Sequence, residues 1–224
     1  MIVLNGQSLT LESLHNIARN QEEVVIDESS KKLVNIAADY VKQIAKEDKA
    51  VYGINTGFGH LAHVKIDKQA LSDLQVNLLK SHACGMGEPL SIDVVRAMMA
   101  LRINALIQGY SGIRLETIEK MVTLLNLNII PVVFEKGSLG ASGDLALLSH
   151  MSLPLIGLGE VYFEGQRMDA MLAFEKAKIK PLEKLHTKEG LSLINGTQAM
   201  GAIGGLVLYD AIKLLDCANL ALAM

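Results

Sequence analysis

Residues 134–147 read FEKGSLGASGDLAL, and this stretch decides how the rest of the chain is interpreted. Glycine recurs at every third position, at Gly137, Gly140 and Gly143, and Asp144 then opens an apolar run typical of a helix. Such a loop can cradle a phosphate, because helix N-termini attract anions. However, it matches neither GxGxxG, GxxxxGK[ST] nor GxSxG, and it contains no basic side chain. The simple structural alternative is a tight loop that leads into a helix.

The tripeptide at 141–143 allows a more specific interpretation. If the loop forces the backbone nitrogen of Gly143 onto the carbonyl carbon of Ala141, a ring can close, because glycine has no Cβ to block the approach. Loss of water then turns the side chain of Ser142 into an alkene. The product, 4-methylidene-imidazol-5-one (MIO), is an electrophile made without an external cofactor.

Three further stretches stand around this loop in the chain. They are residues 51–59 (VYGINTGFG), residues 81–82 (SH) and residues 193–198 (LINGTQ). Together with residues 132–145, they resemble the ordered motifs of the aromatic amino acid ammonia-lyases, and the resemblance covers essentially the whole chain. It implies a mainly α fold of the fumarase/aspartase-like superfamily. In that fold, a small N-terminal region with short strands and glycine-rich active-site loops precedes the first long helices of a central bundle.

The resemblance also implies roles for particular residues. The MIO group would form from Ala141, Ser142 and Gly143, with Tyr52 as the base for the substrate β-proton. Asn195 would hold the oxygen of the electrophile and stabilise negative charge there. The structural alternatives are a strand-end aromatic that packs at position 52 and a helix N-cap at position 195.

Three supporting positions come from the same motifs, namely Gly59, Asp144 and Gln198. Asp144 would anchor the loop, although an acidic residue at a helix N-terminus also has a purely structural explanation. The sequence departs from the common family pattern at two places beside the loop. Phe134 and Leu147 stand where prolines are common.

Residues 81–82 occupy the position that sorts ring types in this family, and a Ser-His pair is similar to the histidine ammonia-lyases. The imidazole of His82 can form a hydrogen bond with a polar substrate ring. The implied reaction removes ammonia non-oxidatively from L-histidine and gives trans-urocanate. The structural alternative for His82 is a loop histidine with satisfied hydrogen bonds. The alternatives for the protein are another ammonia-lyase or aminomutase acting on tyrosine or phenylalanine, and a non-catalytic fragment that only self-associates.

Composition narrows the possible partners. The net charge of −3 argues against binding of nucleic acid through bulk electrostatics. Cys84 and Cys217 are too few and too far apart for a disulfide framework or a zinc site, so we expect a cytoplasmic protein. No segment is apolar enough to predict a membrane helix with confidence. His60, His63 and His150 lack ligand spacing with carboxylates, so no metal is expected.

The family pattern also predicts how the chain is organised. Residues 1–110 would hold the tyrosine loop and the Ser-His loop, and residues 111–224 the electrophile loop, a hairpin and the start of the bundle. Family members are longer, and their later half supplies another tyrosine, a carboxylate-binding arginine and an acidic residue. We therefore expect a truncated chain that is inactive alone and an intact homotetramer. Hydrophobic residues make up 50% of the chain, which agrees with such association.

Capping residues and periodicity predict the individual elements. Thr10 and Asp27 are predicted helix caps, and Glu164-Gly165 is the predicted turn of a hairpin over residues 160–169. The helix after Asp27 carries an apolar stripe on one face, formed by Leu33, Ile36, Ala37, Tyr40, Val41 and Ile44. The other predicted elements are strands at 2–4 and 24–26, and helices from about 67, at 91–108, at 115–125, from 144 and at 195–224.

Overall fold

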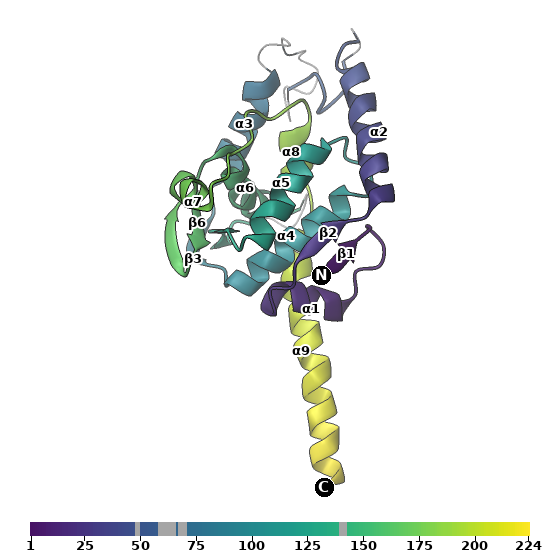
Figure 1. Ribbon diagram of the computed structural model, residues 1–224, viewed down its shortest axis with the longest axis vertical. Helices are drawn as coiled ribbons and strands as arrows, with labels where there is room; N and C mark the ends of the chain where they lie inside the picture. Colours follow the sequence, from purple (N-terminus) through teal and green to yellow (C-terminus); the bar gives the residue numbers. More distant parts are fainter. Residues whose placement is uncertain (48–49, 58–65, 67–70, 139–142) are drawn as a thin grey trace.

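The computed structural model describes residues 1–47, 50–57, 66, 71–138 and 143–224. Figure 1 shows helices gathered around α4 (Ile92–Leu106), with short strands at the margins and one helix that extends far beyond the rest. The predicted mainly helical fold with a few short strands is confirmed. The predicted cap at Asp67 lies outside the described residues.

The other described helices are short or of medium length, and only the last of them, α9, is long. They are α1 (Leu11–Arg19), α2 (Glu28–Ile44), α3 (Leu71–His82), α5 (Leu115–Asn126), α6 (Leu145–Ser152), α7 (Ala170–Ala177), α8 (Glu189–Ile194) and α9 (Gln198–Ala223). A short 3₁₀ helix, η2 (Leu153–Ile156), follows α6 directly.

The strands form three small sheets. In the first, β1 (Ile2–Leu4) pairs in parallel with β2 (Val24–Ile26). In the second, β3 (Met86–Pro89) runs antiparallel to β5 (Phe134–Lys136). The third has the antiparallel order β4 (Ile130–Pro131), β6 (Glu160–Phe163) and β7 (Gln166–Asp169). The sequence analysis had predicted β1, β2 and the β6–β7 hairpin, and had missed β3, β4 and β5.

Helix α4 is the centre of the core, because apolar side chains cover nearly its whole circumference. It packs against α1, α5 and α9. Arg96 also lies inside this core at 1% exposure, where its guanidinium donates to the carbonyls of Ile17 (2.9 Å) and Leu125 (3.0 Å). A buried guanidinium is tolerated there because fixed backbone oxygens replace water around it.

Local signals in the sequence predicted the helix starts and the hairpin well. Thr10 Oγ1 accepts a hydrogen bond from Ser13 N, and the Asp27 carboxylate caps α2 in the same way. Glu164 and Gly165 both have positive φ, at 52° and 75°, as a two-residue type I′ hairpin turn requires.

Two expectations from the sequence were wrong in part. On α2, the apolar stripe does not form one buried face, because Leu33, Ile36 and Tyr40 are more than half exposed while Val41 is buried. The side of α2 that meets the rest of the chain packs instead on the segment before α5, where Val41 fills the space over Gly112. Periodicity alone does not reveal which apolar side chains have a partner.

The last helix starts later than predicted, at Gln198 instead of Asn195. Asn195 instead follows the last residue of the short helix α8, and its backbone is extended (φ −84°, ψ 95°). The predicted helix over residues 195–224 therefore included three residues that lie between α8 and α9. The turn at Gly196 interrupts the helical hydrogen bonds.

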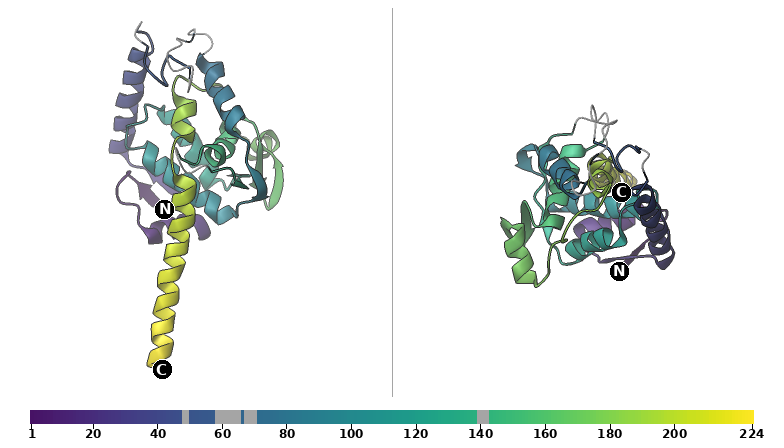
Figure 2. Two further views of the ribbon diagram at one scale, coloured as in Figure 1. Left: turned by 180° about the vertical axis from the view of Figure 1, so that it is seen from behind. Right: turned by 90° about the horizontal axis from the view of Figure 1, so that it is seen from above.

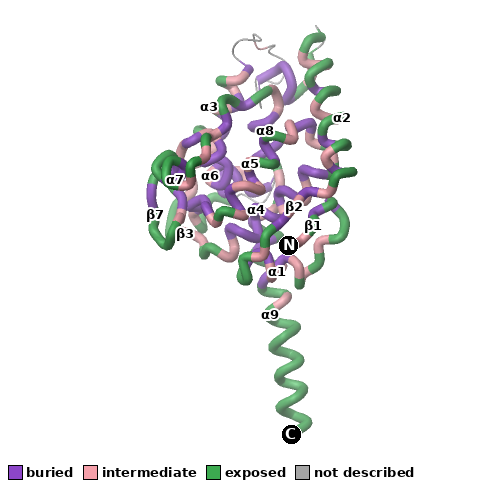
Figure 3. Tube along the Cα trace, in the orientation of Figure 1, coloured by how far each residue is buried: buried purple, intermediate pink, exposed green. Residues whose placement is uncertain are grey.

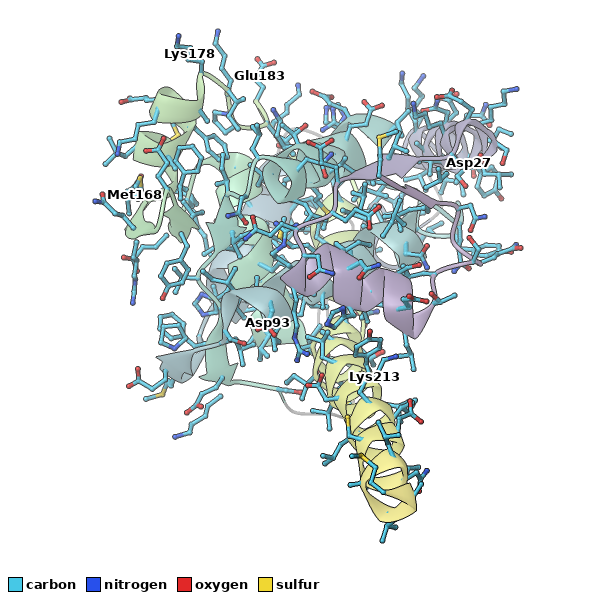
Figure 4. All side chains as sticks on the ribbon, turned by 60° about the horizontal axis from the view of Figure 1, so that its bottom comes forward. Asp27, Asp93, Met168, Lys178, Glu183 and Lys213 are labelled. Atoms are coloured by element: carbon cyan, nitrogen blue, oxygen red, sulfur yellow. The ribbon has the colours of Figure 1, made fainter. Side chains whose placement is uncertain are left out.

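Helix α9 has an anchored half and a projecting half. Arg19 of α1 binds the Asp210 carboxylate through both Nη atoms, and His15 stacks on Tyr209 with 4.2 Å between ring centroids. Beyond this point α9 leaves the rest of the chain, as the view from behind shows (Figure 2). The projecting half is exposed on all sides (Figure 3). Near its start Lys213 (Figure 4) places its ammonium 5.6 Å from the centroid of the Tyr209 ring. In the part of the chain that the structure describes, no helix is long and apolar enough to cross a membrane.

Candidate active site

The two ends of the glycine-rich loop are held by two different parts of the fold. At its start, strand β5 pairs with β3, with Lys136 opposite Met86 and Phe134 opposite Pro89. A Cβ on Gly137 would lie only 3.3 Å from the Cα of Gly85. The segment that follows the Ser-His motif therefore lies directly against the start of the loop.

At the end of the loop, Gly143 lies against the turn that follows α8. Its φ is 113°, a conformation that residues with a Cβ rarely adopt, and a Cβ there would overlap the carbonyl oxygen of Gly196. The N–H of Asp144 donates to that same oxygen at 2.6 Å. The loop and the asparagine motif, more than fifty residues apart, thus meet through Gly196.

The Asp144 carboxylate is fully buried and connects three segments. Its Oδ1 accepts from Ser138 Oγ (2.8 Å), at the other end of the loop. Its Oδ2 accepts from the backbone N–H groups of Ala199 (2.9 Å) and Met200 (3.1 Å), in the first turn of α9. Asp144 precedes α6, but its side chain makes no cap to α6. The carboxylate instead neutralises the positive end of the dipole of α9.

Asn195 sits where α8 ends, and its backbone N–H donates to Leu191 O (3.0 Å). It is not the N-cap of α9, because Thr197 takes that position. The alternative interpretation of Asn195 as a helix N-cap was therefore wrong, since Asn195 is the C-cap of α8. The residue is exposed, so its amide is open to a molecule bound beside the turn.

The sequence analysis missed Arg102, which lies beneath this turn. Its guanidinium donates to Gln198 Oε1 (2.8 Å), to the carbonyl of Asn195 (3.1 Å) and to the carbonyl of Ser192. Burial lowers the pKa of Arg102 to about 10, so it remains charged at neutral pH. In the sequence, the only indication of a role for Arg102 is its charge within the apolar run of α4. Arg96 lies in the same run, so this indication does not distinguish the two arginines.

A second buried network, also missed, fixes the start of α8. Glu189 is fully buried, and its carboxylate accepts from Arg114 Nε (3.1 Å) and Nη2 (3.0 Å) and from Thr117 Oγ1 (2.7 Å). The backbone N–H of His186 adds a further bond at 2.7 Å. Asn195 follows the other end of α8. By fixing the start of α8, this network therefore also fixes the position of the asparagine turn.

The ring of His82 is held within its own helix. Its Nδ1 lies 2.9 Å from the carbonyl of Leu78 and 3.1 Å from Ser81 Oγ. A carbonyl oxygen only accepts, so Nδ1 carries the proton in this arrangement. In the neutral ring, Nε2 is then the atom that can accept a hydrogen bond from a substrate.

Tyr52 lies in a turn (residues 52–55), and it is 55% exposed. The alternative interpretation of a packed strand-end aromatic was therefore wrong. A Cβ on the next residue, Gly53, would lie 2.7 Å from a methyl group of Leu191 in α8. The tyrosine turn therefore approaches α8 one turn before Asn195.

His150 packs against the segments on both sides of the start of the glycine-rich loop. Its Nε2 accepts the N–H of Gly85 (3.0 Å), and its ring packs edge-on against Phe134 at 5.1 Å between centroids. Burial lowers the pKa of His150, which favours the neutral form that this hydrogen bond needs. Phe134 thus uses the space beside the loop for a ring contact that a proline could not make.

Gly59, Ala141 and Ser142 lie outside the described residues, as do His60 and His63. The described end of the loop nevertheless fits ring closure, because Gly143 is buried in a conformation and a space that admit only glycine. A cavity of about 510 Å³ lies elsewhere, between α2 and residues 186–187, and none of the predicted site residues lines it.

The described fold is similar to that of solved ammonia-lyases and aminomutases. The chain belongs to the aromatic amino acid lyase family, whose model matches residues 9–224. It is 48% identical over 224 residues to the histidine ammonia-lyase of Streptococcus gordonii and 51% identical over 223 residues to that of Alkaliphilus oremlandii. Each match covers the whole chain and 44% of the relative, so the chain spans less than half the length of these proteins.

Solved structures give the same assignment of the fold. The histidine ammonia-lyase of Trypanosoma cruzi is 35% identical with a TM-score of 0.88, over 95% of this chain and 41% of that one. Ergothionase from Treponema denticola has a TM-score of 0.91 at 33% identity, over 95% and 42% of the two chains. Tyrosine aminomutase from Streptomyces globisporus has a TM-score of 0.89 at 35% identity, over 95% and 40%.

Proposed function

We propose that this chain is the electrophile-bearing part of an enzyme that removes ammonia from L-histidine and releases trans-urocanate. The observation that carries the proposal is the close contact between Gly143 and Gly196, in the turn after Asn195. The chain is also about 50% identical in sequence to histidine ammonia-lyases. The close contact supports the glycine nitrogen as a ring-closing group, and the relatives support histidine as the substrate.

The electrophile forms from the chain itself. The backbone nitrogen of Gly143 bonds to the carbonyl carbon of Ala141, and that carbonyl oxygen leaves as water. The hydroxyl of Ser142 then leaves with its α-proton as a second water. The group so formed supplies an electrophilic methylene carbon, which captures the substrate amine and improves a poor leaving group.

The other site residues bind the substrate and move its proton. Tyr52 removes the β-proton, which requires the phenolate form and therefore a positive environment around the turn at residues 52–55. The amide of Asn195 donates to the developing negative charge on the electrophile. The Nε2 atom of His82 accepts the ring N–H of the substrate, because Leu78 holds the Nδ1 proton of His82.

Association of subunits completes the proposal. Apolar side chains are exposed along α9 and α2, including Leu214, Leu215 and Leu222 on the projecting half of α9. Exposed apolar surface of this kind is typical of an interface. We infer a cytoplasmic homotetramer in which α9 packs within a bundle of helices from several subunits.

The proposal is tested with the intact gene product and its Ser142→Ala variant. The wild type should form urocanate, detected by ultraviolet absorbance, and its mass should be lower than the sequence mass by two waters. Ser142→Ala should fold and form none, because the methylene carbon comes from that side chain. Turnover like wild type in this variant contradicts the electrophile, and a β-amino acid product instead of urocanate indicates an aminomutase.

The same assay applies to residues 1–224 alone. We expect no urocanate from them, because the carboxylate-binding arginine and second tyrosine that the family pattern places in the later half are absent from these residues. Loss of a proton carrier alone lowers rates by about 10²–10⁴-fold. Turnover near that of the intact protein would show that the later half is dispensable.

A further inference from the structure

Arg102 is a buried cation under the asparagine turn, and none of the described residues offers it a carboxylate partner. The residue is 4% exposed, and within the described part of the chain its hydrogen bonds go to three uncharged oxygens. Burial is the only cause of its lowered pKa, since no carboxylate offsets it. An apolar side chain would fill this space without that desolvation, so packing alone does not explain a guanidinium here.

The oxygens that Arg102 binds lie on one short segment, residues 192–198, which runs from the end of α8 to the first residue of α9. Its Nη2 reaches the carbonyl of Asn195 at 3.1 Å, and its Nη1 reaches Gln198 Oε1 at 2.8 Å. A Cβ on Gly196, between them, would overlap both Nη1 and Gln198 Oε1. The turn is therefore pressed closely onto the guanidinium.

Gly196 is also the residue that holds the end of the loop. Its carbonyl oxygen accepts the N–H of Asp144 at 2.6 Å and occupies the space where Gly143 would carry a Cβ. Arg102 and Gly143 therefore contact the same residue, so a shift of the guanidinium moves the surface against which Gly143 is held.

We propose that Arg102 is a positioning residue for ring closure at residues 141–143. Its planar group of donors fixes the position of Gly196, and Gly196 in turn holds Gly143 in the glycine-only conformation from which its nitrogen closes the ring, with loss of the two waters described above. The inference rests on the proposed function, since it concerns the same loop. A lysine at this position keeps the charge but presents a single ammonium, which cannot hold all three oxygens in the same geometry.

The test compares Arg102→Lys with Arg96→Lys in the intact gene product. Arg96 is a matched control, since it lies in the same helix, is buried and donates to backbone carbonyls, none of them near the loop. Intact mass gives the fraction of chains that have lost two waters, and thermal unfolding gives Tm. We expect both variants to lower Tm, but only Arg102→Lys to lower the dehydrated fraction, by about tenfold or more.

Gln198→Ala provides a second variant, which leaves the guanidinium in place and removes one of its three acceptors. We expect it to fold and to lower the dehydrated fraction less than Arg102→Lys. The inference is wrong if folded Arg102→Lys is fully dehydrated, or if Arg96→Lys lowers the fraction equally. If Arg102→Lys does not fold, a fully dehydrated Gln198→Ala also overturns it. A wild type that loses no water overturns the proposed function and this inference together, whereas a dehydrated wild type leaves the function standing.

Discussion

Asp144 Oδ2 accepts a hydrogen bond from the backbone N–H of Ala199 at 2.9 Å, across 55 residues of sequence. One carboxylate at the start of α6 thereby caps α9, while its other oxygen binds Ser138 at the far end of the glycine loop. The loop that would form the electrophile and the helix that leaves the domain are thus coupled through a single side chain.

Asp144→Asn tests this coupling. An amide accepts only through its oxygen and carries no charge, so the variant reverses or loses the bond with Ser138 and removes the charge that faces the N-terminus of α9. We expect a loss of about 1–3 kcal/mol in the free energy of unfolding, measured with denaturant. Asp169→Asn is the control, because Asp169 caps α7 at the surface and asparagine caps equally well. Equal losses in the two variants would contradict the coupling.

Gly143→Ala should destabilise the chain more than Gly165→Ala. Both glycines have positive φ, 75° at Gly165 and 113° at Gly143, so alanine strains the backbone by about 1 kcal/mol at Gly165 and by about 1–3 kcal/mol at Gly143, whose φ lies outside the left-handed region. Only at position 143 does the new Cβ also overlap another residue, whereas nothing lies within 4 Å at Gly165. We expect the extra overlap to add about 1–3 kcal/mol, measured by denaturant unfolding. A smaller loss at position 143 than at 165 would show that the loop moves freely away from Gly196.

Glu189→Gln should be destabilising, because the amide nitrogen of glutamine cannot accept from the donors that the buried carboxylate binds. We expect a loss of about 1–3 kcal/mol. Glu116→Gln removes the other carboxylate bound to Arg114, whose side chain is 64% exposed, and should cost less than about 1 kcal/mol. Chemical unfolding of the two variants measures the difference. Similarly small losses in the free energy of unfolding would mean that water solvates the Arg114 guanidinium when residue 189 is uncharged.

Stability should fall as the solution becomes acidic, through His150 and His186. Burial lowers the pKa of both rings below the ordinary value of 6.5, so between that value and the folded pKa the unfolded chain binds more protons. Their contribution is therefore complete above pH 6.5 and declines as the pH falls below it. His150→Gln should flatten the fall of Tm between pH 8 and pH 5. An unchanged pH dependence of Tm in this variant would show that His150 does not contribute to the loss of stability at acidic pH.

His82→Leu should change which ring is preferred in the intact protein. It removes the hydrogen-bond acceptor for a polar ring, so the ratio of kcat/KM for histidine over phenylalanine should fall by about 1–3 kcal/mol in transition-state free energy. Steady-state rates with both amino acids give this ratio. An unchanged ratio places His82 outside the substrate pocket.

The sequence by itself determined the features that depend on neighbours within a few residues. The Thr10 and Asp27 caps, the Glu164-Gly165 turn and the motif that identifies the family are of this kind, since a cap or a tight turn is completed by atoms two or three positions away. The mainly helical fold, which the resemblance to the family implied, is also correct.

Only the tertiary structure decided how the motifs meet. The sequence placed Asp144 at a helix N-terminus but gave no sign that its carboxylate would cap α9, and it gave no partner for Arg102, whose acceptors lie 90 to 96 residues away. Helix α8 and strands β3 and β5 escaped prediction because pairing and burial, and not local propensity, form such short elements. Contacts between distant segments depend on how the helices pack around α4, and no local pattern encodes that arrangement.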